Sequence, residues 1–147
     1  ALPQATASCV MGRCAVASCA AGRGDCDRDP TNGCEVALGA TPAHCGACGV
    51  ACPTRPNTVI SCVNGVCQYA CAFGFADCNN NLIADGCEVN LFTNRQNCGS
   101  CGHNCVLTFN VTATACFSGE CIITGCAAGF EDANDIYEDG CEAPTGG

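Results

Sequence analysis

A cysteine pattern that repeats along the chain is the sequence feature that most constrains its fold. Twenty of the 147 residues are cysteine, a density typical of a scaffold held together by disulfides. Two full copies of the pattern and one partial copy contain all of them: Cys9, Cys14, Cys19, Cys26, Cys34, Cys45, Cys48 and Cys52; Cys62, Cys67, Cys71, Cys78, Cys87, Cys98, Cys101 and Cys105; Cys116, Cys121, Cys126 and Cys141. We therefore interpret the chain as a tandem array.

The composition leaves little material for a conventional apolar core. The chain has no Trp, one Met, two Tyr and six Phe, so packing alone does not offset the conformational entropy lost on folding. The expected fold is small and disulfide-rich, with mostly short β-hairpins and loops, arranged as a tandem repeat rod of about 2.5 units. The expected domains are an N-terminal extension (1–8), repeat 1 (9–61), repeat 2 (62–115), and a truncated repeat 3 with its tail (116–147).

The charge excludes several classes of partner. A net charge of -9, with five Arg and no Lys, argues against nucleic acid and against anionic membranes. No apolar run reaches the length of a transmembrane helix, so no membrane insertion is expected. An even number of regularly spaced cysteines predicts full oxidation, and hence an extracellular location, secreted or on the cell surface.

Each copy of the pattern opens with a hairpin signal. Asn64-Gly65 is a preferred type I′ turn pair, and Met11-Gly12 and Ser118-Gly119 occupy the same place in the other copies. The turn places the first two cysteines of a copy opposite each other. A glycine-rich bend, a polar loop ending in GCE and a short strand follow. The later cysteines at i, i+3 and i+7, as in residues 45–52, are predicted to face one side of a helical turn.

The partial third copy suggests how the cysteines divide. It keeps positions one, two, three and five, and Ala133 replaces the fourth cysteine. If the survivors pair among themselves, the cysteines form two closed sets, with the pairing inside each set left open. The first set is Cys9, Cys14, Cys19, Cys34, Cys62, Cys67, Cys71, Cys87, Cys116, Cys121, Cys126 and Cys141. The second is Cys26, Cys45, Cys48, Cys52, Cys78, Cys98, Cys101 and Cys105, with Cys26 and Cys78 each joined to one of the last three of its copy.

The acidic loops are the best candidates for a ligand site, and calcium is the candidate cofactor. Alternating oxygen ligands at calcium-loop spacing occur in repeat 2, at Asp77, Asn79, Asn81, Ile83 (through its carbonyl), Asp85 and Glu88. Repeat 1 offers Asp25, Asp27, Asp29 and Glu35, and repeat 3 offers Asp132, Asn134, Asp135, Glu138 and Asp139. The glycine expected at the sixth position is missing. The alternative is an Asn/Asp turn whose side chains cap backbone amides.

Other motifs carry weaker signals. CGAC and CGSC are typical of thiol–disulfide oxidoreductases or, with His44 and His103, of zinc sites, but structural disulfides explain them better in this repeated lattice. Arg23-Gly24-Asp25 spells an adhesion tripeptide, and Asn110 begins an N-glycosylation sequon. No nucleophile–base pair stands out, so enzyme activity is not expected.

The pattern CxxGxC…DC…GCEV…NCGxCG…C resembles cysteine-rich repeats of secreted myxobacterial surface proteins and of algal mastigoneme-type filament proteins. The resemblance implies an extracellular, glycosylated structural or adhesive protein that binds copies of itself end to end, other surface proteins, or glycans. The sequence thus favours a disulfide-stapled spacer or filament subunit. The alternatives are a calcium-dependent adhesion module and, third, an oxidoreductase.

Overall fold

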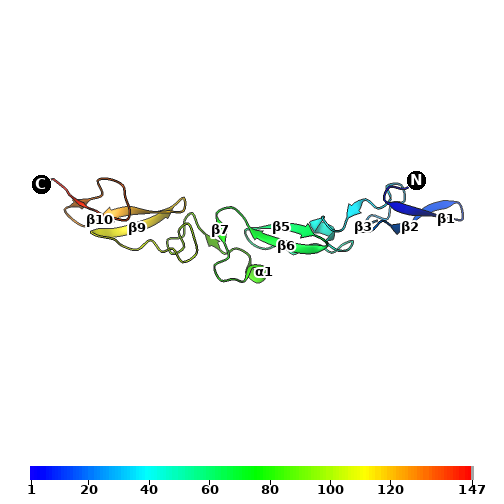
Figure 1. Cartoon of the computed structure of the whole chain (residues 1–147), viewed down its shortest axis with the longest axis horizontal. Helices are drawn as coiled ribbons and strands as arrows, with labels where there is room; N and C mark the ends of the chain where they lie inside the picture. The colour runs from blue at the N-terminus through cyan, green and yellow to red at the C-terminus, as the bar shows by residue number, and fades with distance from the viewer. Residues whose placement is uncertain (147) are drawn as a thin grey trace. The chain divides into compact units, whose positions relative to one another are not determined.

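The fold is known from a computed structural model that describes residues 1–146. It consists mainly of short strand pairs and turns. Within that range the strands are β1 (Ala5–Val10), β2 (Arg13–Cys19), β3 (Arg23–Gly24), β4 (Val36–Ala37), β5 (Thr58–Val63), β6 (Val66–Cys71), β7 (Phe75–Ala76), β8 (Val89–Asn90), β9 (Val111–Phe117), β10 (Glu120–Cys126), β11 (Phe130–Glu131) and β12 (Ala143–Pro144). The helical elements are the 3-10 turn η1 (Pro42–His44) and the single-turn helix α1 (Leu82–Asp85). The expected fold class is confirmed: a small disulfide-rich fold of short hairpins (Figure 1).

Three long hairpins, β1–β2, β5–β6 and β9–β10, stand where the sequence places its turn signals. In the first, Met11 and Gly12 both adopt positive φ, 50° and 77°, as a type I′ turn requires. The turn sets Cys9 opposite Cys14, and the third hairpin sets Cys116 opposite Cys121. Turn chemistry therefore fixes the register of these cysteine pairs.

A two-residue ladder closes each acidic loop. β3 pairs with β4, β7 with β8, and β11 with β12, all antiparallel. These three ladders enclose residues 25–35, 77–88 and 132–142, so the first and last acidic residue of each loop are brought together. The cystines Cys19–Cys34, Cys71–Cys87 and Cys126–Cys141 cross-link the same segments.

The glycine of each GCE motif has a steric reason. Gly33, Gly86 and Gly140 have φ of 76°, 84° and 81°, a region that L residues with a side chain rarely adopt. A Cβ on any of them would also collide with a backbone carbonyl, that of Pro3, Pro56 or Phe109. The cysteine that follows donates its amide to the same carbonyl. This glycine lets the loop approach the residues just before the first strand of the hairpin in its own copy.

Cystine sulfur takes the place of an apolar core. Apart from Val111, the buried apolar side chains among residues 1–146 are all cysteines: Cys34, Cys45, Cys52, Cys62, Cys87, Cys98, Cys105, Cys116 and Cys141. Removing such a bridge therefore deletes both a cross-link and most of the local buried contacts. A native disulfide commonly stabilises a fold by about 2–4 kcal/mol.

The nine disulfides of the described residues follow one repeating rule, of which the third copy keeps only the first bridge. The third cysteine pairs with the fifth and the fourth with the seventh, whereas the sixth and eighth pair with the first and second of the next copy. The pairs are Cys19–Cys34, Cys26–Cys48, Cys45–Cys62, Cys52–Cys67, Cys71–Cys87, Cys78–Cys101, Cys98–Cys116, Cys105–Cys121 and Cys126–Cys141. Cys26 and Cys78 each bond one of the three partners that the sequence left open.

The division into two closed sets is corrected by this pairing. Cys45 and Cys52 of the proposed second set bond Cys62 and Cys67 of the first, and the same crossing recurs 53 residues further on at the bridges of Cys98 and Cys105. The physical reason is that a hairpin's cysteine pair receives its partners from the preceding copy. Cysteines that survive in a truncated copy therefore need not bond one another.

Residues 45–52 and 98–105, which we name the triple-cysteine turns, also differ from expectation. All of both segments is described, and neither contains a helix. Gly46 and Gly49 adopt positive φ of 83° and 78°, and such left-handed residues interrupt a helix. The three cysteines of each turn consequently point to separate partners, two in the next hairpin and one in the acidic loop.

The chain forms two compact units, residues 1–54 with 59–70, and residues 55–58 with 71–147. These bounds do not follow the sequence repeats, because each triple-cysteine turn is bonded to the next hairpin. Residues 1–8 are not a separate extension either. Ala5 to Ser8 belong to β1, and Pro3 accepts the Cys34 amide at 3.1 Å.

Candidate cation-binding loops and cysteine sites

The acidic loop of repeat 1 brings three carboxylates together. Asp25 follows β3 and Glu35 precedes β4, so the ladder between these strands sets the two residues side by side. One oxygen from each of Asp25, Asp27 and Glu35 lies within 4.8 Å of the other two. Two oxygens that each bind calcium at 2.3–2.6 Å lie at most about 5 Å apart. The spacing therefore fits a single calcium ion.

One oxygen of this group is without a hydrogen bond. Asp25 Oδ1 is buried and has no partner among residues 1–146, and the same holds for Asn32 Oδ1 in the same loop. Burying an unpaired polar atom costs free energy. A bound ligand would therefore stabilise the loop most by contacting these two unpaired oxygens.

Asp29, the remaining candidate of this loop, turns elsewhere. Its Oδ1 accepts the Thr31 hydroxyl at 2.7 Å and the Thr31 amide at 2.9 Å. These two hydrogen bonds lower the pKa of Asp29 below its usual range, the hydroxyl contributing most. Asp29 therefore stabilises a turn and stands outside the carboxylate group.

In repeat 2 the calcium-loop spacing is used for backbone capping. The two oxygens of Asp77 accept the amides of Asn81 and Leu82 at 3.0 and 2.9 Å. The Ile83 carbonyl, expected at the seventh ligand position, lies in α1 and accepts a hydrogen bond from Arg55 Nε. These contacts are those of an Asn/Asp turn that leads into a helical turn.

The remaining repeat 2 candidates bond one another or the backbone. Asn79 accepts the Asn81 amide at 2.9 Å and donates to Asp85 Oδ2 at 2.7 Å. Glu88 Oε1 accepts the Cys78 amide at 2.9 Å. Glu35 makes the same bond to the Cys26 amide at 2.9 Å, so this glutamate braces the loop in both copies.

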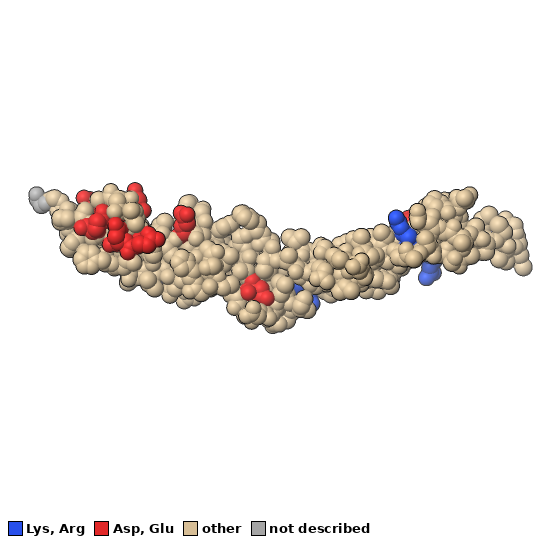
Figure 2. Space-filling view, viewed as in Figure 1, with Lys and Arg blue, Asp and Glu red and all other residues tan. Residues whose placement is uncertain are grey.

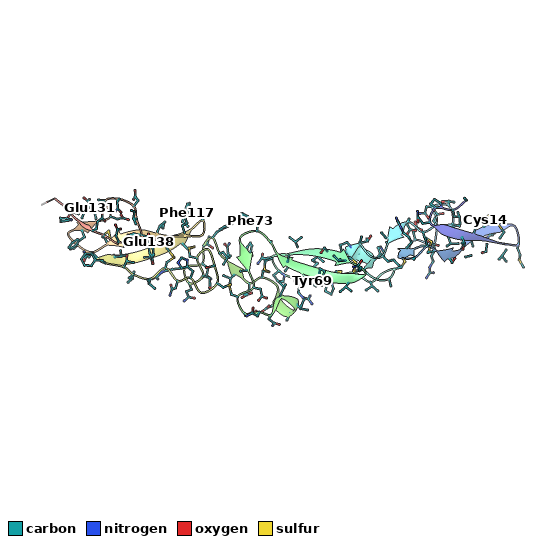
Figure 3. All side chains as sticks on the ribbon, viewed as in Figure 1. Cys14, Tyr69, Phe73, Phe117, Glu131 and Glu138 are labelled. Carbon is teal, nitrogen blue, oxygen red and sulfur yellow. A yellow bond between two sulfur atoms is a disulfide. The ribbon has the colours of Figure 1, made fainter. Side chains whose placement is uncertain are left out.

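Repeat 3 repeats the braced loop in a strongly acidic setting. Glu142 accepts the Ala133 amide, and Asn134 donates to Asp139 Oδ2 at 2.9 Å. Figure 2 shows the acidic side chains gathered near this end of the second unit, and Figure 3 places Glu131 and Glu138 there. A polar groove of about 490 Å³ lies beside the loop, lined in part by His103, Glu120 and Tyr137. Within residues 1–146, neither this loop nor that of repeat 2 contains three acidic side chains as close as those of repeat 1.

The CxxC motifs hold structural cystines with separate partners. Cys45 bonds Cys62 and Cys48 bonds Cys26, so the two cysteines of CGAC are not a redox pair. Zinc binds cysteine as the free thiolate, whereas these sulfurs are held in disulfides. His44 accepts the Gly49 amide at 2.9 Å, and His103 Nδ1 donates to the Cys98 carbonyl at 2.5 Å. Both histidines therefore brace the triple-cysteine turns.

Cys9 and Cys14 are the free cysteines of residues 1–146, and the sequence interpretation missed them. Both are exposed, with their Sγ atoms 3.4 Å apart. The pKa of Cys9 is raised, chiefly by its hydrogen bond to Cys14 and then by charge repulsion from it. No sequence signal distinguished them, because the first two positions of every copy hold cysteine.

Two surface motifs have structural roles. Gly24 of the Arg-Gly-Asp triplet is buried in β3, where a Cβ would lie 2.8 Å from Cys48 Sγ, so the triplet is not a protruding loop tip. Asn110 of the sequon has φ 55° and donates to the Cys141 carbonyl at 3.3 Å. Asn57, at the equivalent place, makes the same bond to Cys87 at 2.9 Å. Glycosylation of Asn110 stays a prediction.

No helix within residues 1–146 combines the length and the apolar character needed to cross a membrane. In comparisons with known proteins, no family model matches the chain, and no curated protein or solved structure matches it. The function must therefore be argued from the chain's own pattern of bonds.

Proposed function

We propose that the chain is an extracellular structural protein, a disulfide-stapled spacer or a subunit of a surface filament, and not an enzyme. Its dense disulfide bonding favours an oxidising, extracellular environment, because such bonds persist outside the cytosol. The resemblance to repeats of secreted surface and filament proteins points the same way.

The observation that carries the proposal is the overlap of successive disulfide loops. The bridges Cys19–Cys34, Cys26–Cys48, Cys45–Cys62 and Cys52–Cys67 each begin before the previous one ends. Those of residues 71–121 overlap in the same way. The short segments between these blocks, 68–70 and 122–125, lie in strands β6 and β10.

This overlap has a mechanical consequence. A force applied to the two ends cannot extend the chain beyond its shortest path through the sulfur–sulfur bonds until one of those bonds breaks. A fully reduced chain, by contrast, extends by about 3.3–3.6 Å for each residue. The cross-linked chain therefore suits a part that transmits load with limited extension.

Force spectroscopy on single molecules held at the two termini tests this role. We expect the oxidised chain to reach less than about half of the extension of the reduced chain before it breaks. A matched control is the oxidised Cys126→Ser/Cys141→Ser chain, which should gain length only from the loop that this bridge closes, since no other bridge overlaps it. Equal extension of oxidised and reduced chains would contradict the proposal.

Association with copies of itself or with other surface proteins completes the proposed role. Large apolar side chains are exposed in the second unit, among them Phe73 and Phe117, with 91% and 68% of their surface accessible (Figure 3). Exposed apolar groups favour association. Sedimentation and electron microscopy should show assemblies at high concentration, and a strictly monomeric species there would argue against a filament subunit.

Calcium-dependent adhesion is a second candidate, supported by the close carboxylates of repeat 1. Calorimetric titration of the oxidised chain with calcium should give binding heat that Asp27→Asn abolishes. Asp135→Asn, in the loop of repeat 3, is the matched control and should leave the heat unchanged. An absence of heat in the unsubstituted chain would reject this candidate.

A further inference from the structure

The first hairpin has the sulfur arrangement of the other two but none of their partners. We propose that Cys9 and Cys14 of β1–β2 are the acceptor site for a triple-cysteine turn supplied by another segment, bonded through its first and third cysteines. The inference goes beyond the proposed structural role, because it assigns a covalent docking site to one named hairpin.

The second and third hairpins show what occupies such a site. Cys62 bonds Cys45 and Cys67 bonds Cys52; Cys116 and Cys121 bond Cys98 and Cys105 in the same order. Cys116 and Cys121 face each other in register and yet do not bond each other. A facing pair of cysteines at the end of a long hairpin is thus, in both examples, a receiver of two separate bridges.

The hairpin tip supplies a second, independent observation. Where a triple-cysteine turn is docked, two glycines meet: a Cβ on Gly65 would lie 3.2 Å from Gly46 Cα, and one on Gly119 would lie 3.5 Å from Gly99 Cα. At Gly12, the equivalent position, a Cβ would meet nothing within 4 Å. The tip of the first hairpin is therefore vacant at the place where the others are covered.

Burial follows the same division. Cys62 and Cys116 retain 6% and 9% of their accessible surface, whereas Cys9 and Cys14 are exposed and Met11 is 99% exposed. Figure 3 labels Cys14 on this hairpin. Exposed thiols beside an exposed apolar tip, in a molecule whose other sulfurs are bonded, match the surface that a docked turn would cover.

The occupant is defined by its chemistry. It must offer two free cysteines seven residues apart, with a glycine after the first, as in residues 45–52. Both such turns of this chain are already bonded to their own following hairpins. The partner segment therefore comes from outside the residues described here, either elsewhere in one longer polypeptide or on a second polypeptide.

The bond formation balances with a disulfide oxidant such as oxidised glutathione. The Cys9 thiolate attacks one glutathione sulfur, forming a mixed disulfide and releasing a glutathione thiolate. A thiolate of the partner segment then attacks the Cys9 sulfur and releases the second glutathione thiolate. The same two steps join Cys14, so two oxidant disulfides become four thiols while two protein disulfides form.

A synthetic peptide provides the direct test. It carries residues 38–53, LGATPAHCGACGVACP, with Cys48→Ser, and it is mixed with the 147-residue chain in a glutathione buffer. We expect a one-to-one product with the peptide's first cysteine bonded to Cys9 and its last to Cys14. Because the second bond forms at an effective concentration of about millimolar, closure by the tethered peptide should exceed attachment of a second peptide to Cys14 by roughly a hundredfold at ~10 µM peptide.

Two controls separate docking from simple thiol reactivity. Gly12→Asn keeps a residue type that tolerates positive φ but fills the vacant tip, and it should reduce the doubly bridged product at least severalfold. A peptide with Gly46→Val should be captured equally poorly. Equal capture in all three experiments, or a chain that closes Cys9–Cys14 within itself instead, would overturn the proposal.

Protein isolated from its native source, with thiols blocked at lysis, identifies the origin of the segment. Disulfide mapping should find Cys9 and Cys14 bonded to a triple-cysteine turn. A mass that falls on reduction places that turn on a second polypeptide, and a mass that is unchanged apart from added hydrogens places it in the same one. Free thiols, or a Cys9–Cys14 bond, in the native protein would refute the acceptor role.

Discussion

Hairpins β1–β2 and β9–β10 share a turn type and a facing cysteine pair but differ in everything that covers them. In β9–β10, Cys116, Val111 and Thr114 are buried, and the Thr114 hydroxyl donates to the Cys105 carbonyl at 2.8 Å. In β1–β2 the corresponding cysteine is exposed and unbonded. The comparison teaches that each hairpin forms from its own turn and strand residues, whereas the triple-cysteine turn bonded to it buries it.

The largest difference should come from deleting the cysteines themselves. Cys98→Ser/Cys116→Ser removes a buried bridge across 18 residues and should lower the free energy of unfolding of the second unit by about 2–5 kcal/mol. Cys9→Ser/Cys14→Ser removes no bridge and should change the free energy of unfolding of the first unit, which contains both residues, by less than about 0.5 kcal/mol. Denaturant unfolding measures both, and equal losses would break the comparison.

A glycine pair tests the contact between turn and hairpin tip. Gly99 and Gly102 have nearly the same φ, 76° and 78°, but only a Cβ on Gly99 would meet a neighbour, the Gly119 carbonyl at 2.5 Å; the site at Gly102 is open. Alanine at Gly102 should cost only the backbone strain, about 1 kcal/mol, and at Gly99 about 1–3 kcal/mol more. Thermal unfolding of the two oxidised variants compares them.

Equal destabilisation by Gly99→Ala and Gly102→Ala would show that close approach to the tip does not contribute to stability. It would also remove the steric support for a vacant tip at Gly12.

Amide exchange should distinguish the two hairpins without any substitution. The hairpin β9–β10 is bonded to a triple-cysteine turn, whereas no such turn within residues 1–146 is bonded to β1–β2. We expect slower exchange in β9–β10 by at least about tenfold, since protection follows local opening. Hydrogen exchange followed by NMR measures these rates. Similar protection in both hairpins would mean that the bonded triple-cysteine turn adds little to hairpin stability.

The smallest expected effect concerns the free thiols. Because Cys14 raises the pKa of Cys9, less of the Cys9 thiol is ionised at neutral pH, and it should react with iodoacetamide more slowly than an ordinary exposed thiol. The rate should recover as pH rises through the raised pKa. Cys14→Ser should restore the ordinary profile, and an unchanged profile would contradict the assigned cause.

Local features of this fold were readable from the sequence. The turn pairs Met11-Gly12 and Asn64-Gly65 placed the hairpins because their backbone preferences are intrinsic to those residues. The Asn/Asp turn offered as the alternative for residues 77–88 describes the hydrogen bonds that the loop makes. Spacing alone could not distinguish it from a calcium loop, since both need oxygen atoms at alternate positions.

Features that depend on contacts between copies were not readable. The pairing of Cys45 with Cys62 joins two repeats, and periodicity cannot tell a bond within a copy from one to the next. Gly46 and Gly49 interrupt the helix that the cysteine spacing suggested, because spacing says nothing of a positive φ. Asp25, Asp27 and Glu35 form a group because the β3–β4 ladder brings the loop ends together.

Disulfide mapping of the oxidised 147-residue chain tests the central claim, that disulfide bonds join each copy of the pattern to the next. Digestion without reduction, followed by fragmentation that cleaves sulfur–sulfur bonds, should yield Cys45–Cys62, Cys52–Cys67, Cys98–Cys116 and Cys105–Cys121, with Cys9 and Cys14 reactive toward alkylating agents. Bridges that close inside each hairpin, Cys62 to Cys67 and Cys116 to Cys121, would contradict it.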